Sequence, residues 1–264
     1  MGLSDLFLPE RLPRQVVYAA DRHAEIVTLQ NGRIAARRRE EGMALAEGSP
    51  DAWEKVVARL RPEETGVVFS AAPFVYNFFE FDRLPWKTKA LHELVTWRLQ
   101  KIFPEDIAAY DHRFFQLDKK RVFSILAPLA LTEAVERCFR AHGVPLIFIG
   151  NSTVEVLARL QAAKPAPDFF IESDRDGCTM VFHNRRSPIY IRKFRSGSGA
   201  DSVEEIGKTV TFVRNNYGVD PRRYWLVDHQ DEGASAAMEA RLEASGLSRL
   251  RAGLGEAPHI PGSS

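Results

Sequence analysis

Two stretches of the sequence decide how the rest of it is interpreted. Residues 16–27 read VVYAADRHAEIV, and residues 169–182 read FFIESDRDGCTMVF. In each stretch two apolar runs flank a short charged segment, which is the pattern of a β-hairpin. Because these stretches open the two halves of the chain, the sequence predicts a duplicated α/β fold with mixed sheets and a cleft between two lobes.

The order of the predicted elements supports this duplication. Each half reads as three strands, a helix, a strand and a helix, although few residues are identical between the halves. In the second half the predicted elements are strands over 168–173, 178–183 and 188–195, a helix over 202–217, a strand over 224–227 and a helix over 235–242. Asn31-Gly32 predicts a tight hairpin turn, and Gly143 predicts the end of a helix over 132–141. Ser202, with Glu205 three residues later, predicts a capping box at the start of the second-half helix.

A different pattern lies within the first half. It reads as a strand over 75–81, a helix over 87–103, and strands over 109–117 and 122–129. This β-α-β-β block indicates a subdomain at about 75–130, inserted in a first lobe. We therefore expect the first lobe at 1–164, a reduced second lobe at 165–252, and a weakly ordered tail at 253–264.

Composition excludes several classes of function. The formal net charge of +1 gives no global electrostatic argument for binding nucleic acid. Cys138 and Cys178 are the only cysteines, too few for a disulfide framework or a cysteine-based zinc site. No stretch approaches the roughly 20 apolar residues that a membrane-spanning helix needs. These features predict a cytoplasmic protein without a membrane span of its own.

The layout resembles the actin-like ATPase fold, which is RNase H-like, and within it the PilM family of type IV pilus assembly proteins. The cytoplasmic domain of the type II secretion protein GspL is a close relative of that family. The likeness rests on MGLSDLFL at 1–8, FDRLP at 81–85, Trp97, FPE at 103–105 and YDHRF at 110–114. It extends through 127–129, 204–206 and Tyr217-Gly218, and so covers roughly residues 1–245.

The departures from this family concern the nucleotide. The resemblance implies Asp-x-Gly turns in both hairpins, whose glycines let backbone N–H groups approach phosphate. Ala20 and Arg22 stand at the first pair of positions, and Glu172 and Asp174 at the second. A one-residue shift brings Asp21 to the acidic position but leaves His23 where glycine is needed.

Two further nucleotide contacts are altered. The family has a Gly-Gly turn near the adenosine, and this chain has Asp228-His229 there. The helical subdomain that covers the base is replaced by the short segment 196–201. We therefore expect no bound ATP or magnesium and no hydrolysis.

The resemblance also implies partners. A cytoplasmic segment of a PilN-like bitopic membrane protein is expected beside the inserted subdomain, where Tyr76, Phe78, Phe79 and Trp86 are candidate contacts, although these aromatic residues also fit core packing. An assembly ATPase is a second expected partner, and a homo-oligomer is compatible. The protein would then be a non-catalytic scaffold, held at the inner membrane through its partners.

Other interpretations remain open. The chain could bind ATP at an unusual site in which Asp21 and Asp176 hold magnesium, or it could be the soluble part of a longer GspL-type protein. Gly207-Lys208-Thr209 matches the end of a phosphate-binding loop but falls inside a predicted helix, which favours a chance match. The histidines lack the spacing of a zinc site. Glu172, Asp174 and Asp176 could together ligate a divalent cation, but the interposed Arg175 favours a solvated charged turn, so no metal is expected.

Overall fold

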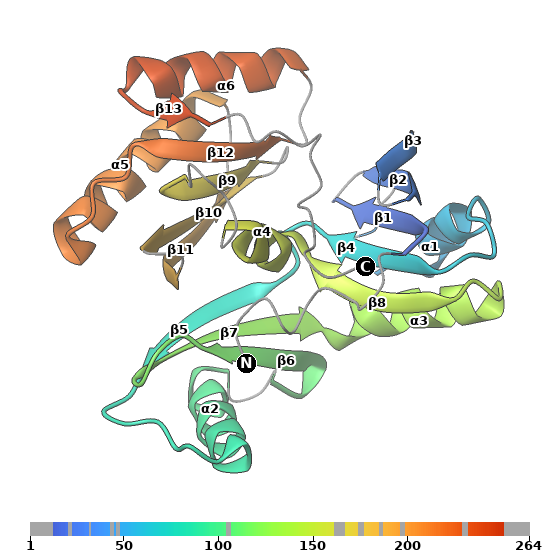
Figure 1. Ribbon diagram of the computed structural model, residues 1–264, viewed down its shortest axis with the longest axis horizontal. Helices are drawn as coiled ribbons and strands as arrows, with labels where there is room; N and C mark the ends of the chain where they lie inside the picture. Colours follow the sequence, from blue (N-terminus) through green and yellow to red (C-terminus); the bar gives the residue numbers. More distant parts are fainter. Residues whose placement is uncertain are drawn as a thin grey trace.

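The structure is a computed structural model that describes residues 13–20, 23–31, 33–42, 45, 48–103, 107–160, 167–173, 177–184, 187–195, 199–228 and 232–250. Its elements form three sheets with helices packed against them, so the predicted mixed α/β architecture is confirmed (Figure 1). No helix in this part of the chain has both the length and the apolar content needed to span a membrane.

The first sheet has the spatial order β3-β2-β1-β4-β8. Its strands are β1 (Gln15–Ala19), β2 (His23–Gln30), β3 (Arg33–Glu41), β4 (Thr65–Phe69) and β8 (Leu146–Asn151). Strands β1, β4 and β8 run parallel, and β2 and β3 extend the sheet in antiparallel fashion. Helices α1 (Pro50–Val57) and α3 (Leu129–Ala141) pack against each other beside it. Trp53 of α1 joins them to the sheet, with its ring centroid 5.5 Å from Phe69 and 6.4 Å from Phe139.

The second sheet repeats this arrangement. Its spatial order is β11-β10-β9-β12-β13, which matches the first sheet strand for strand. Its strands are β9 (Phe169–Ser173), β10 (Gly177–Asn184), β11 (Ser187–Arg195), β12 (Arg223–Asp228) and β13 (Ser248–Arg249). Helices α5 (Gly199–Tyr217) and α6 (Glu232–Ala244) contact each other beside this sheet, and side chains of both join an apolar core that includes Phe169, Met180 and Phe182.

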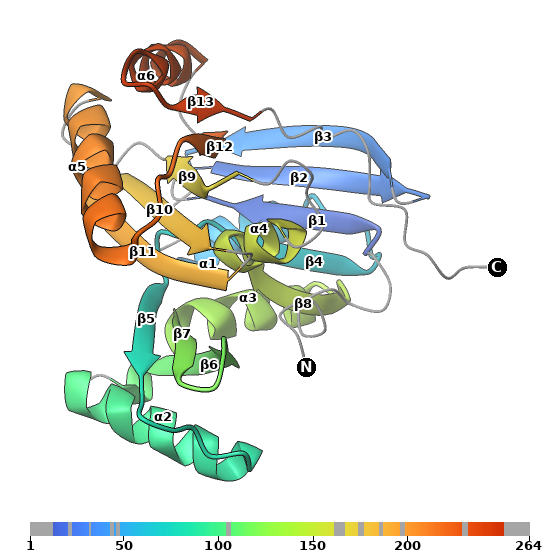
Figure 2. The same ribbon diagram turned by 60° about the vertical axis from the view of Figure 1, so that its left-hand side comes forward.

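The third sheet has three antiparallel strands in the order β5-β7-β6. Its elements are β5 (Val75–Glu80), α2 (Thr88–Ile102), the short 3-10 helix η2 (Ile107–Ala109), β6 (Tyr110–Gln116) and β7 (Arg121–Pro128). Helix α2 covers one face of it, because Leu91, Val95 and Leu99 pack on side chains of β5 and β7. Figures 1 and 2 both place α2 at one end of the molecule, away from the second sheet.

Local details correct two predictions and confirm two. Helix α5 begins at Gly199, so Ser202 lies inside the helix and does not cap it. Helix α3 begins at Leu129, because the chain turns helical directly after β7. Asn31 has φ 51° and Gly143 has φ 64°, which confirms the turn and the helix end predicted at these residues.

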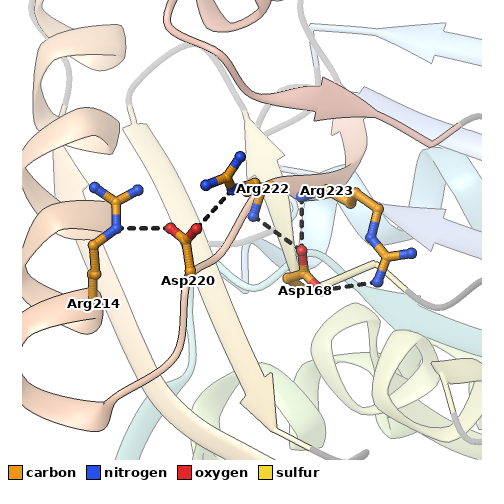
Figure 3. Close-up of polar contacts among 5 residues, drawn as sticks. All are labelled: Asp168, Arg214, Asp220, Arg222 and Arg223. Carbon is orange, nitrogen blue, oxygen red and sulfur yellow. Dashed lines mark hydrogen bonds and ion pairs between the residues drawn. The ribbon is translucent and has the colours of Figure 1, made fainter.

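Charged residues hold the beginnings of β9 and β12 together (Figure 3). Asp168 accepts hydrogen bonds from the backbone N–H groups of Arg222 and Arg223 at 3.0 and 2.9 Å, and pairs with the Arg223 guanidinium at 3.2 Å. Asp220 bridges Arg214 and Arg222 at 2.7 Å each. Burial raises the pKa of Asp168, but the two N–H donors and Arg223 outweigh it and lower the pKa. This network fixes the end of β9 that lies away from the first sheet.

Candidate functional site

The two lobes meet through a buried carboxylate at the other end of β9. Glu172 is the fourth residue of β9, only 4% exposed, in a strand whose residues are all buried. Its Oε1 accepts a hydrogen bond from the Tyr18 hydroxyl at 2.7 Å. Its Oε2 accepts hydrogen bonds from the Ser152 hydroxyl at 2.6 Å and from the Ala71 backbone N–H at 3.2 Å. All three donors belong to the first lobe, so Glu172 joins the second lobe to the first.

Each donor is placed by a different element of the first lobe. Tyr18 is the fourth residue of β1, Ala71 follows β4, and Ser152 is the first residue of α4 (Ser152–Leu160). The amino-terminal end of a helix carries partial positive charge, which favours a carboxylate beside Ser152. Burying a carboxylate is costly unless hydrogen bonds compensate, and here three donors do so.

Strand pairing makes Tyr18 the counterpart of Glu172. The last pair of the first hairpin is Ala19 with Ala24, and that of the second is Ser173 with Cys178, so each joins residues five apart. Tyr18 and Glu172 each precede that pair by one residue. Matching hairpins therefore place these two residues at the same position, where they bond to each other.

This register corrects the sequence alignment. The alignment with the family's Asp-x-Gly turns put Ala20 and Glu172 at the same position, that of the aspartate. The strand pairing instead makes Ala20 equivalent to Asp174, which is two residues beyond Glu172. Ala20 itself is buried, with 1% of its surface exposed. Asp21, Arg22, Asp174, Asp176 and His229 lie outside the described residues, and for Asp228 only the backbone, at the end of β12, is described.

Gly177, the one glycine of the second hairpin, has a structural reason to be there. It begins β10, and a Cβ on it would lie 2.4 Å from the backbone oxygen of Phe194 in β11. Its lack of a side chain is thus required by the neighbouring strand. A phosphate is not needed to explain it.

A lysine holds the same segment of the first lobe as Glu172 does. Lys193 of β11 donates hydrogen bonds to the backbone oxygens of Ala72 and Phe74, at 2.5 and 2.8 Å. Glu172 binds the N–H of Ala71 in the same segment. The second lobe therefore supplies an anion to the N–H group and a cation to the carbonyl groups of residues 71–74.

Tyr76 completes the polar contact from the third sheet. Its hydroxyl hydrogen-bonds to Asn151 Oδ1 at 3.1 Å and to Thr153 Oγ1 at 3.0 Å. Burial raises the pKa of the phenol well above its usual range, and the charge of Glu172 adds to the rise. Tyr76 thus lies in the network between the sheets as a neutral hydrogen-bonding group.

Apolar side chains seal the same contact. Phe170 and Val181 of the second sheet belong to the core cluster of the first lobe, and Ile191 and Trp225 pack against it. Val154 and Leu157 of α4 join this cluster from the other side. Figure 1 shows α4 between the first and second sheets. The polar contacts around Glu172 are therefore continuous with a shared apolar core.

The remaining aromatic candidates have different environments. Phe78 is half-buried and stacks on Phe123 with a centroid distance of 5.1 Å. Phe79 is 5% exposed and packs beneath α2, so it offers little surface to a partner. Trp86, in the loop between β5 and α2, is 98% exposed.

Two other sequence features are explained by the fold. Lys208 lies inside α5 and pairs with Glu204 and Glu205 at 2.8 and 2.9 Å, so the phosphate-loop match has no loop geometry. His112 hydrogen-bonds to Thr96 of α2 at 3.1 Å and its ring lies 4.9 Å from that of His92. Among the described residues, no three His, Cys, Asp or Glu side chains form a group that could hold a metal.

Sequence reasoning singled out Glu172 but missed its partners. Tyr18, Ala71 and Ser152 are 154, 101 and 20 residues from Glu172 in the sequence, and only the folded chain brings them together. The one indication of this contact in the sequence was the glutamate itself. A charged residue in the otherwise apolar strand FFIES needs a hydrogen-bonding partner when it is buried.

Known structures share this architecture. No protein-family model and no curated protein matches the sequence. A solved PilM-PilN type IV pilus biogenesis complex contains a chain that is 14% identical, with a TM-score of 0.68 over 91% of this chain and 88% of that one.

Two more structures agree with it. The cytoplasmic domain of EpsL, an inner-membrane component of the type II secretion system of Vibrio cholerae, is 9% identical, with a TM-score of 0.55 over 96% of this chain and 91% of that one. A Bacteroides thetaiotaomicron protein with an actin-like ATPase fold and unknown function is also 9% identical, with a TM-score of 0.58 over 89% and 90% of the two chains. The chain therefore has the actin-like ATPase fold, as the sequence resemblance predicted.

Proposed function

We propose that this protein is a non-catalytic scaffold of a type IV pilus or type II secretion assembly at the inner membrane, with a nucleotide site that has lost its function. It would act in the cytoplasm by binding the cytoplasmic segment of a membrane partner, and an assembly ATPase would be a second partner. The observation that carries this proposal is the buried Glu172 carboxylate, which joins the lobes through three hydrogen bonds to the first lobe.

The chemistry of this contact disfavours a nucleotide. Phosphate groups need N–H and O–H donors, and the donors from Tyr18, Ala71 and Ser152 are already bonded to Glu172. A phosphate brought to them would also meet the negative charge of that carboxylate. In this proposal the protein's own anion stabilises the closed arrangement of the lobes, so no ligand is needed for it.

The fold supports the proposed setting. The similar PilM chain was solved in a complex with PilN, and the similar EpsL domain belongs to an inner-membrane component of a secretion system. For this chain we place the partner segment beside β5. This strand is at the edge of its sheet, and an edge strand has backbone groups that an added strand can pair with. Phe78 on β5 is the side chain best placed to contribute, because it is only half-buried, whereas Phe79 is 5% exposed and the Tyr76 hydroxyl is bonded to Asn151 and Thr153.

Calorimetric titration of the full chain with ATP and magnesium tests the nucleotide claim. We expect no binding at millimolar nucleotide, since the donors are taken and the anion repels phosphate. The same titration with Glu172→Gln shows whether the carboxylate is the obstacle. Binding of ATP by the wild type at micromolar concentration would refute the proposal.

A peptide titration tests the partner claim. The probe is a synthetic peptide covering the cytoplasmic segment of a PilN-like bitopic membrane protein from the same organism. We expect Phe78→Ser to weaken its binding about tenfold or more, as for a contact residue. Phe212→Ser, a matched change of an exposed phenylalanine on α5, should leave binding unchanged. If the two variants bound the peptide with equal affinity, the proposed binding site beside β5 would be wrong.

A further inference from the structure

Helix α2 exposes aromatic and basic side chains at one end of the molecule. Val95 is fully buried against the third sheet, and Trp97 follows it by two residues, which turns its side chain to the opposite side of the helix. Trp97 is 48% exposed, and Trp86 in the preceding loop is 98% exposed. Two tryptophans this exposed make this end of the molecule a candidate contact surface.

The charge of this region is positive. From Trp86 to Phe103 the chain has four basic residues, Lys87, Lys89, Arg98 and Lys101, against the single acidic residue Glu93, whereas the whole chain has a net charge of +1. All four basic residues are exposed, and none forms an ion pair with another described residue. Lys101 lies 3.8 Å above the ring of Trp97, so a cation and an aromatic ring share the outer face of α2.

Two more lysines lie beside the loop that leads to α2. The backbone oxygens of Lys119 and Lys120, in the β6–β7 turn, accept hydrogen bonds from Leu84 and Phe81 of the loop that leads to α2. Both lysine side chains are exposed. Asp118 of the same turn is paired with Arg121 at 2.6 Å, so the two lysines add positive charge next to the loop that carries Trp86.

We propose that the outer face of α2, with Trp97 and Lys101, and the loop just before α2, with Trp86 and Lys87, bind the surface of an anionic phospholipid bilayer. Tryptophan favours the boundary between headgroups and acyl chains, where its ring is buried and its N–H stays wet. Lysine and arginine side chains lay their alkyl stems along apolar surface and extend their charged groups to anionic headgroups. This surface would orient the protein on the membrane directly, independently of any membrane-bound partner.

Vesicle flotation of the full chain tests this inference. We expect flotation at low salt with phosphatidylcholine vesicles containing about a third phosphatidylglycerol, and none with phosphatidylcholine alone. Raising the salt should release the protein, because the attraction to headgroups is screened. The tryptophan emission should shift to the blue on binding, since Trp86 and Trp97 leave water, while Trp53 is already fully buried.

Paired variants assign the effect to α2. Lys87→Glu/Lys101→Glu and Trp86→Ser/Trp97→Ser should each reduce partitioning about tenfold or more. The control Lys55→Glu/Arg137→Glu makes the same charge change on exposed residues of α1 and α3 and should float like the wild type. Thermal melting confirms that each variant is folded.

Three outcomes would overturn the inference. They are absence of flotation at low salt, equal flotation of the α2 and control variants, and binding of a polyglutamate peptide without binding of vesicles. The last result would assign the face to an acidic protein partner. None of them bears on nucleotide or partner-peptide binding, so this inference and the proposed scaffold function fail separately.

Discussion

The two hairpins at the contact between the lobes have the same backbone and opposite chemistry. In both, the last strand pair joins residues five apart, and in both the residue before that pair faces the other lobe. The first hairpin places the phenol of Tyr18 there, and the second places the carboxylate of Glu172. One is a donor and the other an acceptor, at 2.7 Å from each other.

This difference gives the two lobes a contact made by their own side chains. Two carboxylates at these positions would repel each other, and two phenols would leave no charge for Ala71 and Ser152 to bind. A donor opposite an acceptor satisfies both groups, and the second carboxylate oxygen remains for the Ala71 N–H and the Ser152 hydroxyl. The asymmetry between the halves is therefore what allows the two hairpins to bond to each other.

The largest expected effect comes from removing the acceptor. Glu172→Ala leaves the Tyr18 hydroxyl, the Ser152 hydroxyl and the Ala71 N–H without their acceptor in a buried place. We expect the free energy of unfolding to fall by about 3 kcal/mol, measured by urea denaturation near neutral pH. Hydrogen exchange should also show faster exchange of the amide of Ala71.

A glutamate of the first hairpin supplies the matched control. Glu25 on β2 pairs with Arg37 at 3.6 Å, with 30% of its side chain exposed. Glu25→Ala should cost less than about 0.5 kcal/mol, as is usual for a surface ion pair. If the two alanine variants lost the same free energy of unfolding, Glu172 would contribute no more than a surface ion pair does. That result would contradict the proposed role of Glu172 in joining the lobes.

Acid should destabilise the protein through a buried histidine of the second sheet. His183, near the end of β10, is 8% exposed, and burial lowers its pKa from 6.5 to about 4, although the charge of Asp168 acts in the opposite direction. Protonation is therefore easier in the unfolded chain than in the folded one. The contribution of the neutral His183 to stability is fully present above a pH of about 6.5 and is lost as the pH falls toward about 4. Between a pH of about 7.5 and about 5, we expect a loss of about 2 kcal/mol from this group.

Denaturation curves of two histidine variants measure this contribution. His183→Gln should flatten the dependence of stability on pH in that range. His142→Gln, in which an exposed histidine at the end of α3 is changed, should keep the wild-type dependence. The assignment to His183 is wrong if the two variants have the same pH profile.

The sequence predicted the hairpins and the repeated order of elements because local patterns define them. Apolar runs around charged turns marked β1–β2 and β9–β10, and Gly143 marked a helix end through its left-handed backbone. It missed the two-residue β13 because so short a strand has no period to detect. It also placed the start of α5 at Ser202, since a capping pattern inside a helix looks the same as one at its start.

The site was only half predictable for a physical reason. Glu172 was recognised as unusual for phosphate binding, but its role depends on contacts with residues 154 and 101 positions away along the chain. No local pattern encodes such contacts. The alignment of Ala20 with Glu172 was wrong by two residues for the same reason, because strand register is fixed by pairing between strands.

The smallest expected effect comes from removing one donor. Tyr18→Phe keeps the ring and deletes only the hydroxyl that bonds to Glu172, so we expect a loss of about 1.5 kcal/mol, typical of a hydrogen bond to a charged group. Tyr217→Phe, which deletes the hydroxyl of a 42% exposed tyrosine on α5, should change stability by less than about 0.5 kcal/mol. A double-mutant cycle of Tyr18→Phe with Glu172→Gln then separates the pair from its surroundings. If the two hairpins stabilise each other through this bond, the cycle gives a coupling free energy of about 1 kcal/mol, whereas additive losses would show that each residue acts only within its own lobe.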